Sequence, residues 1–287
     1  MQGPQWLHVF IDVRADVSQA SAKFWSAALG WQLGDPWPGH PEFRSFEPED
    51  GDTYVHQQMG DHGPRIHFDL EVTDETEVER LINLGASLAG EPREWWPMIS
   101  PGGMPFCLVR RRDHVRPSPL TWDGHHSRLV QVCIDSPAGL HEAEVAFWRS
   151  ALSCERRKSR AAARRRREPR RLFSASDDDG GGFQARCASS SETLSWRWAD
   201  SESDEFAGKL YPPPGSSVQL LFQRLGKNAP DGPVRAHIDL GTDDREAHAQ
   251  RLVQLGATRV GPGRGWIVLR DPTGLVFCTT SNSPDAP

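Results

Sequence analysis

The stretch Arg65-Ile66-His67-Phe68-Asp69-Leu70 recurs as Arg235-Ala236-His237-Ile238-Asp239-Leu240, 170 positions further along the chain. Other pairs of segments match in the same order: His8–Asp12 with Gln131–Asp135, Phe24-Trp25 with Phe147-Trp148, Glu42-Phe43 with Glu205-Phe206, Glu79–Ala86 with Gln250–Ala257, and Gly103–Cys107 with Gly274–Cys278. Ordered self-similarity of this kind marks a tandem repeat. The chain is therefore predicted to contain two copies of one domain.

Each copy shows the same succession of elements. In the first, an alternating strand at 7–13 leads into an amphipathic helix at 18–29 that Gly30 ends. Short strands are expected near 31–33, 43–47 and 53–59. A strand at 66–72, a helix at 74–84, and strands near 88, near 98 and at 106–110 complete the copy. The order reads βαβββ twice, so the whole chain is expected to hold four such units.

The repeat also sets the expected boundaries. The first domain is predicted over 1–112, a proline-containing linker over 113–126, the second domain over 127–282 and a tail over 283–287. Residues 154–195 interrupt the second copy with an arginine-rich, low-complexity insert that we expect not to pack. The insert lacks interleaved aromatic residues, and Asp177-Asp178-Asp179 follows its basic run. Nucleic acid is therefore disfavoured as a partner.

Composition excludes other classes. No stretch approaches the roughly 20 apolar residues that span a bilayer, so no membrane association is expected. The opening sequence MQGPQWLHVFIDV lacks the basic start of a signal peptide. The chain has 5 cysteines and no CxxC pair, which suits a reducing cytoplasm better than a disulfide framework. GxGxxG, P-loop, nucleophile-elbow and HExxH motifs are all missing from the sequence.

Three groups of residues resemble one known superfamily. They are His8–Asp12 followed by Phe24-Trp25 and Ala28–Trp31, then Arg65–Leu70 followed by Leu84-Gly85-Ala86, and finally Asp271–Gly274 ending in Phe277-Cys278. Their order resembles the glyoxalase/bleomycin-resistance/extradiol-dioxygenase (vicinal oxygen chelate) superfamily. The resemblance implies an α+β fold of two tandem glyoxalase-like domains. Each would be a pair of βαβββ units forming a curved, cup-shaped sheet with helices on the outside and a small-molecule ligand inside.

Many members of that superfamily hold a divalent metal in the cup. Carried over by position, the ligands would be His8 and His67 in the first copy, and Gln131 and His237 in the second. The glutamate that the family places on the closing strand is replaced by Cys107 and Cys278. Two readings stay open. Cysteine and histidine can bind zinc, with Fe, Ni or Mn as other candidates, or each thiol is a small apolar side chain in a strand.

Aromatic residues outside the regular elements are candidates for ligand binding. Trp37, Trp95 and Trp96 are expected near the mouth of the first cup, where they would stack a flat molecule or cover the sheet edge. His56 would either contact ligand in that copy alone or be exposed, and exposure is favoured. Trp25 and Trp148 are expected in the core. Asp12 and Asp135 are expected to begin turns or cap helices.

Two main functions are compatible with these features. The first is a resistance- or sequestration-type protein that binds a small aromatic molecule without an obligatory metal. The second is a metal-dependent lyase, isomerase or ring-cleaving dioxygenase using His8, His67 and Cys107 or water in the first copy. One copy could also be purely structural. The expected assembly is a monomer with its two domains paired, or a homodimer.

Overall fold

The computed structural model describes residues 6–152, 196–227, 229 and 231–285, and these residues form two mixed sheets with the same strand order. The first sheet runs β2-β3-β4-β1-β5-β8-β7-β6. Its strands are β1 (Leu7–Arg14), β2 (Gln32–Trp37), β3 (His40–Glu47), β4 (Val55–Gly60), β5 (Arg65–Val72), β6 (Ser87–Leu88), β7 (Trp96–Ile99) and β8 (Pro105–Arg110).

The second sheet runs β11-β12-β13-β10-β14-β17-β16-β15, with β9 paired to β10 beside this path. Its strands are β9 (Leu120–Trp122), β10 (His125–Ser136), β11 (Arg197–Asp200), β12 (Phe206–Tyr211), β13 (Gln219–Arg224), β14 (Arg235–Thr242), β15 (Thr258–Pro262), β16 (Trp266–Arg270) and β17 (Val276–Thr280). Strand for strand, this order matches that of the first sheet, which confirms the predicted tandem α+β architecture.

Alternation along the central strands separates a core face from a polar face. In β1, Leu7, Val9 and Ile11 are fully buried in the apolar core. Because side chains alternate between the two faces of a strand, His8 and Asp12 lie on the opposite face. The same alternation runs through β5, β10 and β14. We call this second face the first cup in the first sheet and the second cup in the second sheet.

The helices carry the apolar stripes that the sequence predicted. They are α1 (Ser18–Leu29), α2 (Thr76–Asn83), α3 (His141–Leu152) and α5 (Arg245–Gln254), with a 3-10 turn at Ala15–Val17 before α1. α1 ends at Gly30, whose φ of 73° is the left-handed conformation that favours glycine. Asp244 caps α5 by accepting hydrogen bonds from the backbone N–H groups of Glu246 and Ala247.

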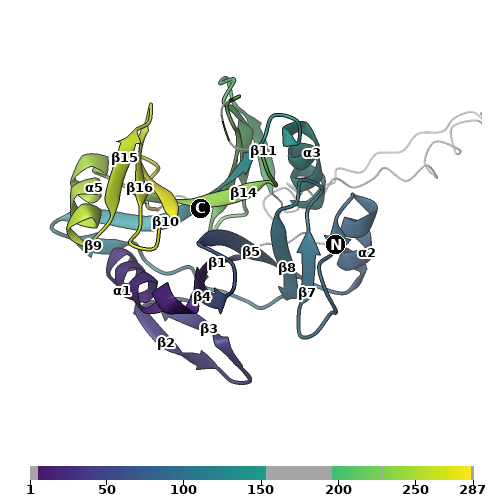
Figure 1. Cartoon of the computed structure of the whole chain (residues 1–287), viewed down its shortest axis with the longest axis horizontal. Coiled ribbons are helices and arrows are strands. Elements are labelled where there is room, and N and C mark those ends of the chain that lie inside the picture. The colour runs from purple at the N-terminus through teal and green to yellow at the C-terminus, as the bar shows by residue number, and fades with distance from the viewer. Residues whose placement is uncertain (1–5, 153–195, 228, 230, 286–287) are drawn as a thin grey trace, which may run out of the picture.

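Each repeat places its first helix against the other repeat. Trp25 on α1 packs edge-on against Phe277 of β17 and donates a hydrogen bond from Nε1 to Asp271 Oδ2 at 2.9 Å. In the reciprocal contact, Trp148 on α3 packs against Phe106 of β8. Figure 1 shows α1 beside the C-terminal strands and α3 beside β8. Both tryptophans are fully buried, which confirms their predicted place in the core.

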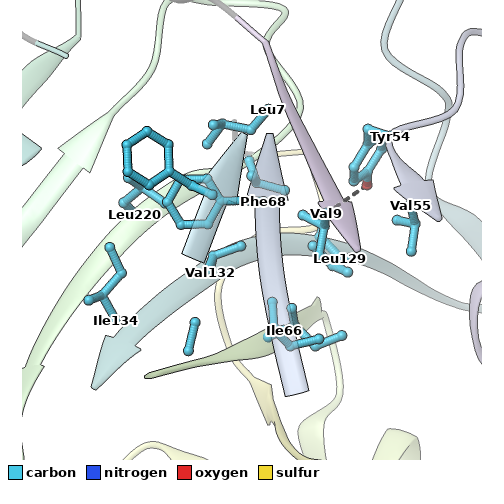
Figure 2. Packing of buried hydrophobic residues seen from close by; sticks show 14 of the residues in the cluster. Leu7, Val9, Tyr54, Val55, Ile66, Phe68, Leu129, Val132, Ile134 and Leu220 are labelled. Carbon is cyan, nitrogen blue, oxygen red and sulfur yellow. Dashed lines mark hydrogen bonds between the residues drawn. The ribbon is translucent and has the colours of Figure 1, made fainter. Parts of the chain in front are cut away.

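The two repeats share one continuous apolar core. Figure 2 shows Leu7, Val9 and Phe68 of the first repeat among Val132, Ile134 and Leu220 of the second. Polar contacts cross the same boundary, because Tyr54 donates its hydroxyl hydrogen to the carbonyl of Leu129 at 2.7 Å. The repeats are therefore expected to unfold together rather than as independent domains.

The segment predicted as a linker, 113–126, includes β9 and the start of β10. The predicted insert at 154–195 lies outside the described residues, so the expectation that it does not pack stays a prediction. Within the part of the chain that the structure describes, no helix has the length and apolar character needed to cross a membrane.

Candidate functional site

The same four side chains meet in each cup. In the first cup they are Asp12 from β1, His67 and Asp69 from β5, and Cys107 from β8. In the second cup they are Asp135 from β10, His237 and Asp239 from β14, and Cys278 from β17. The His-x-Asp spacing places both β14 side chains on one face of the strand, and parallel pairing sets Asp239 beside Cys278.

The two imidazoles are held in the same way. His67 Nδ1 lies 2.7 Å from Asp12 Oδ1, and Nε2 lies 3.7 Å from Asp69 Oδ1. His237 Nδ1 lies 2.7 Å from Asp135 Oδ2, and Nε2 lies 3.4 Å from Asp239 Oδ1. An aspartate therefore lies against Nδ1 of each ring, with a hydrogen bond in the second cup, and the remaining nitrogen points toward a carboxylate and a thiol.

Burial and charge set the protonation of these groups. Burial alone would lower the pKa of His67, but the adjacent Asp12 outweighs it and raises that pKa. The same competition, with Asp135 as the partner, raises the pKa of His237 well above its usual value. Burial, and next the negative charge of Asp69, raises the pKa of the Cys107 thiol. In each cup the adjacent aspartate therefore favours the protonated form of the histidine, and burial favours the protonated thiol.

The roles predicted for Asp12 and Asp135 were wrong. Both were expected to begin turns or cap helices, yet both are buried within a strand, 3% and 7% exposed, and bind the repeated histidines. The sequence could not show this directly, because an aspartate near a strand end meets a histidine only through the register of a neighbouring antiparallel strand. In the first sheet that register sets Asp12 opposite Arg65, next to His67.

Aromatic rings crowd the first cup. The ring of Phe10 stacks on His67 at 4.7 Å between centroids and on His56 at 4.8 Å. His56 was expected to be exposed, which is wrong, since only 3% of it is accessible. Burial, and next the neighbouring His8, lowers the pKa of His56 well below its usual value. Trp37 stands edge-on to His56 at 5.3 Å, so it belongs to the same ring cluster.

The second cup holds an open cavity of about 590 Å³. Cys133 lines it at the strand position where the first repeat has Phe10. The polar residues that line the cavity include His237, Lys209 and Tyr211. Burial lowers the pKa of Lys209. Clefts of this size with a few convergent polar groups are typical of small-molecule sites.

One aromatic pair recurs at both cups. Phe43 on β3 stands edge-on to Trp95 at 5.7 Å. In the second repeat Phe206 stands edge-on to Trp266 at 5.6 Å, and both of these residues line the cavity. Of the predicted ligand-binding tryptophans, Trp95 thus lies opposite β3, whereas Trp96 packs against the apolar core. Trp266 is the residue of the second repeat at the position equivalent to Trp95, so the sequence repeat could have identified it.

The structure separates the metal ligands predicted for the first copy. His67 and Cys107 lie together with Asp69, but His8 lies with Glu71 and His114. In the second copy, His237 and Cys278 lie together with Asp239. Gln131, predicted as a ligand there, donates a hydrogen bond to Asp239 and accepts one from Gln219 at 2.8 Å. The acidic partners Asp69 and Asp239 were missed, although the repeated His-x-Asp spacing pointed to them.

Comparison with known families gives one result that covers most of the chain. The glyoxalase-like domain model matches residues 8–109 and again residues 131–280. These two ranges coincide with the two sheets. Among curated protein sequences, none matches this chain.

Solved structures share the fold at low sequence identity. A Mn(II)-bound glyoxalase from Novosphingobium aromaticivorans aligns with a TM-score of 0.55 and 16% identity, over 99% of this chain and 83% of that protein. The 2,2',3-trihydroxybiphenyl 1,2-dioxygenase of Sphingomonas wittichii strain RW1 aligns with a TM-score of 0.53 and 12% identity, over 97% and 90% of the two chains. The 2,3-dioxygenase LapB from Pseudomonas sp. KL28 aligns with a TM-score of 0.50 and 16% identity, over 99% of this chain and 94% of that protein.

Proposed function

This chain belongs to the glyoxalase-like domain family, and on that premise we propose that its second cup binds a small aromatic molecule that carries an oxygen substituent. The observation that carries the proposal is the cavity of about 590 Å³, which His237, Lys209 and Trp266 line together. The proposal places the ligand in the second copy, whereas the candidate ligand-binding residues predicted from the sequence lie in the first copy.

The lining of the cavity supports the class of ligand. Phe206 and Trp266 offer ring edges and faces for stacking at one side. The ammonium group of Lys209 can donate a hydrogen bond to a phenolate or carboxylate oxygen, and His237, whose protonated form Asp135 favours, lines the same cavity. A flat ring with one anionic or strongly polar oxygen would satisfy both sets of contacts. Sequestration of such a molecule needs no bond to be broken.

Tryptophan fluorescence of the full-length chain tests this proposal. A panel of phenols, catechols and aromatic carboxylates should include members that quench the emission with one saturable site per chain. Replacing Trp266 with Phe should remove most of the quenching, whereas Trp95→Phe, the matched change in the first repeat, should leave it. A panel without any saturable quencher would contradict the proposal.

Metal-assisted catalysis is the second candidate function, and the repeated Asp–His–Asp–Cys arrangement favours it. Asp69 Oδ1 and Asp239 Oδ1 are buried and, among the described residues, have no hydrogen-bond partner. Carboxylates that orient Nδ1 of a histidine, as Asp135 does here, are typical outer partners of metal-binding imidazoles. These residues therefore fit a divalent metal, which would be held by His67, Asp69 and Cys107, or by His237, Asp239 and Cys278.

Such a metal would supply a Lewis acid that polarises ligand oxygens. The protein residues would contribute the rest: Asp135 holds Nδ1 of His237, and Lys209 orients the anionic substituent. This candidate predicts that purified protein retains Zn, Fe, Ni or Mn, and that His237→Ala lowers the metal content of the second cup. Protein that stays metal-free after incubation with each of these ions would exclude it while leaving ligand sequestration intact.

A further inference from the structure

Three side chains outside the repeated clusters converge on one point. His8 comes from β1, Glu71 from β5 and His114 from the segment that follows β8. Glu71 Oε1 lies 3.1 Å from His8 Nε2 and 2.6 Å from His114 Nε2. Two imidazole nitrogens thus face a single carboxylate oxygen, and the three ligand atoms lie within 4.8 Å of one another.

The surroundings bury this carboxylate and hold it in place. The Glu71 side chain is only 2% exposed, and its second oxygen accepts a hydrogen bond from the backbone N–H of Arg112 at 3.1 Å. Its other oxygen faces Nε2 of both imidazoles. A buried charge of this kind is stable only with a paired cation or several donors.

Outer contacts orient both imidazoles. His8 Nδ1 lies 3.0 Å from His56 Nε2, and His56 Nδ1 lies 3.0 Å from Ser45 Oγ. The ring of Trp6 stacks on His114 at 4.5 Å, and His114 Nδ1 lies 3.8 Å from Asp52 Oδ2. Each histidine thus presents Nε2 to the carboxylate. The other nitrogen of His8 faces His56, a partner of the kind that orients metal-binding histidines in known sites, whereas the stacked ring of Trp6 holds His114.

We propose that His8, Glu71 and His114 bind a divalent first-row transition-metal ion, with zinc as the first choice. Two imidazoles and one carboxylate are a known zinc donor set that leaves a position for water, and other first-row ions accept it as well. Because Glu71 also binds the backbone at Arg112, and His114 follows β8, the ion would fasten the segment 111–118 to the first sheet. Its role is therefore to hold the connection between the repeats.

The second repeat supplies an internal comparison. The positions equivalent to His8 and Glu71 are Gln131 and Gly241, so neither an imidazole nor a carboxylate stands there. The site is thus specific to the first repeat, whereas the Asp–His–Asp–Cys arrangement occurs in both. A metal at this site would add to any metal held by the Asp–His–Asp–Cys clusters, and the two kinds can be counted separately.

Equilibrium binding of Zn(II) to the full-length chain, followed by elemental analysis, tests the proposal. His114→Ala and Glu71→Gln should each lower the bound zinc by one equivalent, because each removes one ligand of three. His126→Ala should not, since His126 is an exposed histidine that pairs with Asp243. Zinc should also raise the melting temperature of the wild-type chain and not that of His114→Ala. Circular dichroism in the presence of a chelator verifies that both variants are folded.

Substitution with Co(II) distinguishes this site from the Asp–His–Asp–Cys clusters. The proposed ligands contain no sulfur, so the equivalent lost in His114→Ala should show ligand-field bands without a thiolate charge-transfer band. Cobalt in either cup would show that band through Cys107 or Cys278. The proposal is overturned if wild-type protein binds no zinc or if both variants bind as much as wild type. It is also overturned if the equivalent lost carries the thiolate band.

Discussion

The carboxylate of Asp135 lies 2.7 Å from Nδ1 of His237, on the neighbouring antiparallel strand. The same contact joins Asp12 and His67 in the first repeat, also at 2.7 Å. Because the contact recurs in both repeats of this family member, we interpret it as the feature that fixes the orientation and charge of the cup histidines.

The first prediction concerns the protonation of His237. Asp135 outweighs the effect of burial and holds the pKa of His237 well above its usual value, so Asp135→Asn should lower it. NMR titration of the imidazole resonances measures this directly. Asp12→Asn is the matched control, since it should lower the pKa of His67 and leave that of His237. An unchanged titration in Asp135→Asn would contradict the interpretation.

Stability should follow the same titration. Since the pKa of His237 is raised on folding, its contribution to the free energy of unfolding is complete below about pH 6.5, the usual histidine value. The contribution is lost as pH rises through the raised pKa of the folded state. Urea unfolding of the wild-type chain and of Asp135→Asn across this window should show a shallower pH dependence in the variant. If the free energy of unfolding depended on pH equally in the two proteins, the result would contradict this prediction.

The sequence predicted the fold more fully than the site. Ordered matches such as Phe24-Trp25 with Phe147-Trp148 depend on local pattern, and they identified both the repeats and the core tryptophans. The partners of the cup histidines depend on strand register, which places Asp12 and Asp135 beside residues far away in the sequence. Nor could the sequence reveal that Phe10 crowds one cup while Cys133 leaves the other open.

A second prediction tests the crossed packing of the helices. Trp148 on α3 is fully buried against Phe106 and Phe68 of the first repeat. Trp148→Ala should lower the free energy of unfolding by about 3–5 kcal/mol, the range for large aromatic truncations in a core. Because the core is continuous, urea unfolding should stay a single transition. Two separated transitions, or a loss confined to one repeat, would contradict the shared core.

Glu144 provides a third prediction about the same interface. Its carboxylate accepts hydrogen bonds from Ser100 Oγ at 2.9 Å, from the backbone N–H of Gly102 at 2.8 Å and from Trp148 Nε1 at 2.7 Å. In Glu144→Gln an amide NH₂ group must face one of these donors, which should cost about 1–3 kcal/mol in urea unfolding. Glu142→Gln on the same helix is the control. Its side chain is 82% exposed, so the change should stay within about 0.5 kcal/mol. Equal effects in the two variants would contradict this role of the Glu144 carboxylate.

Exchanging the residues that distinguish the two cups tests the proposed binding site most directly. Phe10 stacks between His56 and His67 in the first cup, whereas its equivalent, Cys133, lines the open cavity of the second. A quencher found in the aromatic panel is titrated into Cys133→Phe and Phe10→Cys by calorimetry, after thermal unfolding shows that both are folded. Cys133→Phe should weaken binding at least about tenfold, which corresponds to about 1.4 kcal/mol, while Phe10→Cys should bind as wild type does. Wild-type affinity in Cys133→Phe, together with its loss in Phe10→Cys, would place the ligand in the first cup and contradict the account.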